Sequence, residues 1–77
     1  MALAALALGA NIGDPAQQIE DAISAINLHP EIDVIARAST IVSKAWGKTD
    51  QPDFFNSAVL VETALEPLEL LDAVLGI

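Results

Sequence analysis

The chain has 77 residues, and its eleven carboxylates against three basic side chains give a formal net charge of -8. A chain of this length forms one small domain. Its shortage of Lys and Arg argues against binding to nucleic acid or to an anionic membrane surface, since both require clustered positive charge. The content of 53% apolar residues argues against intrinsic disorder. The lack of cysteine excludes a disulfide framework and a thiolate metal site, and a cytoplasmic location is expected.

The first predicted element is a strand over Leu3 to Leu8, an uncharged apolar run that we expect to be covered on both faces. No basic residue precedes it, so a strand is preferred over a signal peptide. The loop that follows, Gly9-Ala10-Asn11-Ile12-Gly13-Asp14-Pro15, lacks the Lys-Ser/Thr of a P-loop and the third glycine of a dinucleotide fingerprint. Its glycines are therefore interpreted as serving the backbone geometry of a tight turn.

A helix is predicted next, with Asp14 as its N-cap, Pro15 at its first position and an end near Leu28. Its apolar residues recur at helical spacing and form one face, made of Ile19, Ala22, Ile23 and Ile26. The last predicted helix opens at Pro67. It carries an apolar stripe of Leu68, Leu71, Val74 and Leu75.

Two strands are predicted between these helices. The segment 32–42 is rich in β-branched residues and is interpreted as one long strand. The segment 54–62 forms the second strand, and alternation divides its side chains between two faces. One face carries Phe54, Asn56, Ala58 and Leu60, and the other carries Phe55, Ser57, Val59 and Val61.

The predicted order is therefore β-α-β-β-α, an α+β, ferredoxin-like split βαβ arrangement that lacks its fourth strand. Residues 1–77 are interpreted as a single partial domain, because the apolar stripe of the last helix runs to the end of the chain. In the ferredoxin-like order the missing strand would cover the first one. The uncharged strand Leu3–Leu8 would then be a free edge, and we expect a homo-oligomer that pairs through it.

The segment Asp50-Gln51-Pro52-Asp53-Phe54-Phe55-Asn56-Ser57-Ala58-Val59 holds the candidate binding residues. Phe54 and Asn56 lie two positions apart and share one face of their strand. An aromatic ring can stack on a flat heteroaromatic ligand, and an amide presents a donor and an acceptor to the edge of that ligand. The alternative places Phe54 and Phe55 in the core and makes Asn56 a strand-edge amide, and the residues alone leave both interpretations open.

The Gly9–Asp14 loop, the Asp50–Val59 segment and the Glu62-Thr63 pair together resemble the N-terminal part of the 6-hydroxymethyl-7,8-dihydropterin pyrophosphokinase family. The resemblance implies transfer of pyrophosphate from ATP to 6-hydroxymethyl-7,8-dihydropterin in folate biosynthesis, with Mg²⁺. It implies that Phe54 stacks on the pterin and that Asn56 binds the pterin edge. It also implies that Ser43, Trp46 and Gly47 border the pterin, although family members usually carry Thr-Pro-Pro near Ser43-Lys44-Ala45.

The resemblance implies that ATP and Mg²⁺ are held by an Arg-rich loop and an Asp-x-Asp pair located downstream of Ile77. The chain has no Asp-x-Asp, and Arg37 is its only arginine. No catalytic, cofactor-binding or metal-binding residue is therefore assigned, and the chain alone is expected to be inactive. His29, the only histidine, is interpreted as a turn residue at a helix exit, because no orienting partner for a catalytic base is evident. The alternatives are a non-catalytic pterin-binding or assembly module and a ferredoxin-like domain without a ligand.

Overall fold

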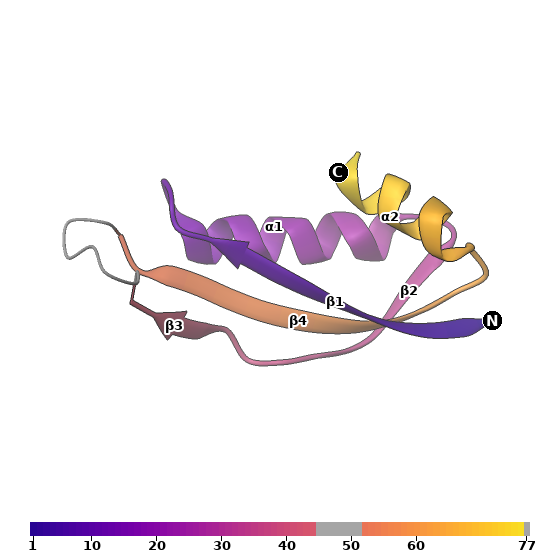
Figure 1. The fold of residues 1–77 in the computed structure, drawn as a ribbon, viewed down its shortest axis with the longest axis horizontal. Coiled ribbons are helices and arrows are strands. Elements are labelled where there is room, and N and C mark those ends of the chain that lie inside the picture. The colour runs from indigo at the N-terminus through magenta and orange to yellow at the C-terminus, as the bar shows by residue number, and fades with distance from the viewer. Residues whose placement is uncertain (45–51, 77) are drawn as a thin grey trace.

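The computed structural model describes residues 1–44 and 52–76. Its elements are β1 (Ala2–Ala10), α1 (Pro15–Leu28), β2 (Ile32–Arg37), β3 (Ile41–Ser43), β4 (Phe54–Thr63) and α2 (Pro67–Leu75). The sheet order is β1-β4-β2, β3 also pairs with β4, and every pairing is antiparallel. Both helices lie on one side of the sheet, and none of the elements that the structure describes covers the other side (Figure 1). The predicted α+β, split βαβ arrangement is confirmed.

The core lies between the sheet and α1, and β4 is central to it. The expected alternation along β4 is confirmed, because Ser57, Val59, Val61 and Thr63 are buried on the helix side. Burying apolar surface is the main stabilising term in a domain of this size. The buried apolar residues are Ile19, Ile23, Ile26, Ile32, Val59, Val61 and Leu70.

Helix α1 forms as the sequence predicts. The Asp14 carboxylate accepts a hydrogen bond from the backbone N–H of Gln17 at 3.2 Å, which satisfies one of the unpaired donors of the first turn. Pro15 occupies the start of the helix, and the last helical residue is Leu28. In the preceding turn Gly13 has a φ of 70°, a conformation that favours glycine. The interpretation of Gly13 as a turn residue is confirmed.

The predicted single strand over 32–42 is wrong in one respect, because it is divided into β2 and β3. The register with β4 shifts between Val34 and Ala36, and residues 38–40 connect the two strands. The buried Ser57 hydroxyl donates to the carbonyl oxygen of Ala38 at 2.9 Å. A Ser hydroxyl competes with backbone donors for such a carbonyl oxygen, which is compatible with the break between β2 and β3.

The burial predicted from the sequence is wrong for two apolar surfaces. Strand β1 is covered on one face only, since both helices lie on the same side of the sheet, and Leu3 is 63% exposed. In α2 the buried residue is Leu70, whereas Leu68 and Leu71 are exposed. This nine-residue helix is apolar on several sides. Spacing alone therefore cannot decide which side meets the core.

Candidate functional site

Three of the five predicted site residues lie together where β3 meets the start of β4. Ser43 pairs directly with Phe54, and Asn56 follows two residues further along β4. Alternation places all three on the open face of the sheet, away from the helices. The end of β1 lies beside the start of β4, whereas α2 lies at the far end of the molecule (Figure 1). Trp46 and Gly47 lie outside the described residues.

A hydrogen bond joins the two polar members of the site. The Nδ2 atom of Asn56 donates to the Oγ atom of Ser43 at 3.1 Å. A primary amide has two N–H donors and one carbonyl acceptor. The second N–H and the Oδ1 atom of Asn56 make no bond with the residues that the structure describes. This bond therefore orients the amide and leaves a donor and an acceptor for a ligand.

The two neighbouring phenylalanines have different environments. Phe55 lies on the helix side of β4 and packs against the core cluster. Phe54 lies on the open face and is 38% exposed. The alternative interpretation, in which both rings belong to the core, is therefore wrong for Phe54. A partly exposed ring on an uncovered face can stack on a planar ligand.

Gly9 also lies at this corner of the sheet, although the sequence-based prediction places it in a turn. It lies within β1, pairs with Asn56, and does not have a positive φ. The interpretation of Gly9 as a turn residue is therefore wrong. A Cβ atom at this position would lie 3.2 Å from the Oδ1 atom of Asn56. The missing side chain leaves space beside the amide, and a glycine within an apolar strand is the signal that would indicate such a close approach.

The described residues do not fit a metal ion or a triphosphate. No group of three His, Asp or Glu side chains among residues 1–44 and 52–76 could hold a metal. The one arginine, Arg37, forms an ion pair with Glu20, with 2.8 Å between its Nη1 and a carboxylate oxygen. A phosphate clamp needs several basic groups that are available to the phosphates, and besides Arg37 the described residues include one basic side chain, Lys44.

The single histidine has a structural role in the turn after α1. The Nδ1 atom of His29 accepts a hydrogen bond from the backbone N–H of Glu31 at 3.0 Å. The backbone N–H of His29 donates to Ile26 at the end of the helix. These bonds match its interpretation as a turn residue. Among the described residues, no helix is long and apolar enough to cross a membrane.

These features define an α+β domain whose open sheet face carries an aromatic ring beside an oriented amide. The profile of one family, described as 7,8-dihydro-6-hydroxymethylpterin-pyrophosphokinase (HPPK), matches residues 5–77. The chain belongs to this family. The resemblance inferred from the sequence is confirmed.

Curated relatives agree with this assignment. A 2-amino-4-hydroxy-6-hydroxymethyldihydropteridine pyrophosphokinase of Methylorubrum extorquens is 42% identical over 77 residues, which is 100% of this chain and 49% of the relative. Proteins of the same name from Pseudomonas aeruginosa and Bacillus subtilis are 39% identical over 94% of this chain and 36% identical over 91% of it. These matches cover 44% and 42% of the two relatives. The chain thus spans about half the length of the curated relatives it matches.

Proposed function

We propose that this chain supplies the pterin-binding face of an enzyme that transfers pyrophosphate from ATP to 6-hydroxymethyl-7,8-dihydropterin in folate biosynthesis. One observation carries the proposal. Phe54 and Asn56 share the uncovered face of β4, and Ser43 orients the Asn56 amide through a bond of 3.1 Å. The ring of Phe54 would stack on the pterin, and the free donor and acceptor of Asn56 would bind its edge.

Family membership supports the choice of a pterin among flat ligands. The relatives named above are pyrophosphokinases of a hydroxymethyldihydropteridine. ATP and Mg²⁺ enter the proposal through the family alone, because no described residue is assigned to hold either. Trp46 and Gly47 are proposed to border the pterin on the same ground. A single partial domain and a cytoplasmic location stay predictions from the sequence.

The test is a titration of the chain with 6-hydroxymethyl-7,8-dihydropterin, followed by calorimetry. Phe54→Ala should weaken binding about two- to tenfold, because one aromatic contact contributes about 0.5–1.5 kcal/mol. Asn56→Ala should weaken binding by a similar factor through the lost hydrogen bonds. Leu60→Ala is the matched control, since Leu60 is 37% exposed on the same face of β4, close to the 38% of Phe54. Equal affinities in the Phe54, Asn56 and Leu60 variants would contradict the proposal.

Catalysis by the 77-residue chain alone is proposed to be absent. The sequence has no Asp-x-Asp pair, and its one arginine is engaged by Glu20. Phosphoryl transfer needs such groups to stabilise negative charge in the transition state. Release of AMP from ATP, Mg²⁺ and the pterin by the purified chain would contradict this statement.

Self-association through β1 is proposed as well. Among the described residues β1 pairs only with β4, so its other edge is unpaired, and its sequence has no charge or proline to prevent pairing. An apolar groove of about 300 Å³ lies between β1 and α2, and its lining includes Leu3, Leu65 and Leu71. Ala5→Lys adds a charge to the exposed face of β1 and should give monomers in light scattering. Association that equals the parent's would contradict the proposal.

A further inference from the structure

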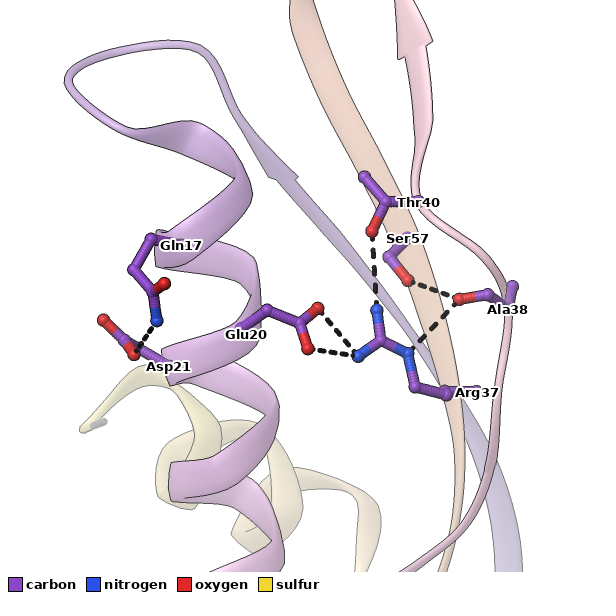
Figure 2. Close-up of polar contacts among 7 residues, drawn as sticks. All are labelled: Gln17, Glu20, Asp21, Arg37, Ala38, Thr40 and Ser57. Atoms are coloured by element: carbon purple, nitrogen blue, oxygen red, sulfur yellow. Dashed lines mark hydrogen bonds and ion pairs between the residues drawn. The ribbon is translucent and has the colours of Figure 1, made fainter.

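An ion pair joins α1 to the end of β2, on the face of the sheet opposite the candidate site. The Arg37 Nη1 lies 2.8 Å from both carboxylate oxygens of Glu20. Figure 2 shows that the same guanidinium also reaches the connection between β2 and β3. Its Nε lies 3.5 Å from the carbonyl oxygen of Ala38, and its Nη2 lies 3.4 Å from the Oγ1 of Thr40. The contact with Glu20 is the strong one, and the other two are long.

The connection that Arg37 touches contains one more residue than the strand beside it. Arg37 pairs with Val59 and Ile41 pairs with Asn56, so the chain takes four residue steps where β4 takes three. Side chains alternate with a period of two, so one extra residue moves every later side chain to the other face. Without it, Ser43 would lie on the helix side of the sheet, out of reach of Asn56.

A similar irregularity explains why Arg37 itself points to the helices. Val34 pairs with Val61 and Ala36 pairs with Leu60, so Ile35 is the extra residue. The shift places Arg37 opposite the buried Val59, on the side of the sheet where α1 and Glu20 lie. The extra residue at Ile35 thus turns Arg37 toward Glu20, and the extra residue in the 38–40 connection turns Ser43 toward Asn56.

Ala38 is held from two sides at this second irregularity. On the β4 side, the Ser57 hydroxyl donates to its carbonyl oxygen at 2.9 Å, and its backbone N–H donates to Ala58 at 2.8 Å. On the α1 side, Arg37 contributes the contacts described above (Figure 2). A short, exposed strand such as β3 specifies its own register weakly. The contacts at Ala38 therefore decide how β3 meets β4.

We propose that Arg37 is a positioning residue of the candidate site. By joining Glu20 to the 38–40 connection, it fixes the extra residue that keeps Ser43 on the face of Asn56. The consequence for a ligand rests on the proposed function, because an unheld Asn56 amide would present its donor and acceptor less often in the orientation that the pterin needs. The register of β3 itself does not depend on any ligand.

The test compares two neighbouring carboxylates of α1 in the full chain. Glu20→Gln removes the ion pair. Asp21→Asn removes a neighbouring carboxylate that, among the described residues, accepts only from Gln17, at 2.8 Å, and does not touch Arg37. The measurement is the intensity of cross-strand NMR contacts between β3 and β4, relative to those between β1 and β4. Exposed ion pairs contribute little free energy. We therefore expect the β3–β4 contact intensity to fall about two- to fivefold in Glu20→Gln and Arg37→Ala, and to stay unchanged in Asp21→Asn.

Pterin affinity provides the second measurement, taken together with the melting temperature. We expect Glu20→Gln to weaken binding about two- to fivefold at a melting temperature within a degree or two of that of Asp21→Asn. Unchanged β3 contacts in Glu20→Gln and Arg37→Ala would overturn the proposal, as would a loss shared equally by the β1–β4 contacts. If the parent chain binds no pterin, the proposed function fails, and the β3 contacts alone still decide the role of Arg37.

Discussion

The two ends of the continuous strand β4 differ in role, since one end packs in the core and the other carries the candidate site. From Val59 to Thr63 the inward side chains are buried, with Val61 at 0% exposure and Thr63 at 1%. From Phe54 to Asn56 the open face carries the candidate site, beside a short strand that pairs over three residues only. The buried end owes its stability to packing, whereas the site end depends on a few polar contacts. A single strand can thus anchor a core at one end and present a ligand face at the other, because successive side chains point to opposite faces of the sheet.

The largest expected effect lies at the buried end. Val61→Ala removes apolar volume from a fully enclosed position and should lower the free energy of unfolding by about 1–3 kcal/mol. Leu60→Ala changes the adjacent residue, which lies on the open face and is 37% exposed, and should cost about 1 kcal/mol or less. Urea denaturation of both variants measures the difference. Equal losses would mean that the open face is covered in solution.

A smaller effect is expected at the junction of the two ends. Ser57 is buried and donates to the carbonyl oxygen of Ala38. Ser57→Ala should lower the free energy of unfolding by about 0.5–1.5 kcal/mol, the net contribution of one hydrogen bond. It should also weaken the NMR contacts between β3 and β4. A loss of stability with unchanged β3 contacts would show that the Ser57 hydroxyl does not set the position of β3.

The smallest effect on stability is expected at the site end. Gly9→Ala introduces a Cβ atom 3.2 Å from the Oδ1 of Asn56, so the amide must shift by a few tenths of an ångström. We expect pterin binding to weaken about two- to tenfold through the displaced hydrogen bonds, with little change in unfolding. Ala7→Ser, two residues away on the same face of β1, is the control. Binding that Gly9→Ala leaves unchanged would remove Gly9 from the site.

Strong periodic and turn signals allowed most of the fold to be predicted. The cap at Asp14, the helix end near Leu28 and the alternation along β4 all follow from local chemistry that tertiary structure did not override. The two irregularities before and after Arg37 could not be predicted, because the contacts found there join residues that are distant in sequence, Arg37 with Glu20 and Ala38 with Ser57. The buried side of α2 was also beyond prediction, since leucines occupy several of its sides.

The candidate site was predicted in part. The spacing of Phe54 and Asn56 indicates a shared face, and the structure brings Ser43 to them. The assignment of these residues to a pterin comes from the family resemblance and stays a proposal. Gly9 was missed because a glycine at the end of a strand is also typical of a turn, and only the pairing with Asn56 shows what its missing side chain leaves open.

The open face at the start of β4 is proposed to bind the pterin ring. Titration of the isotope-labelled chain with 6-hydroxymethyl-7,8-dihydropterin, followed by two-dimensional NMR, tests it most directly. We expect saturable shifts in the signals of Ser43, Phe54 and the Asn56 side-chain amide, with the signals of Val61 and Thr63 unchanged. Shifts centred on the groove between β1 and α2, or no saturable shifts at the start of β4, would contradict the claim.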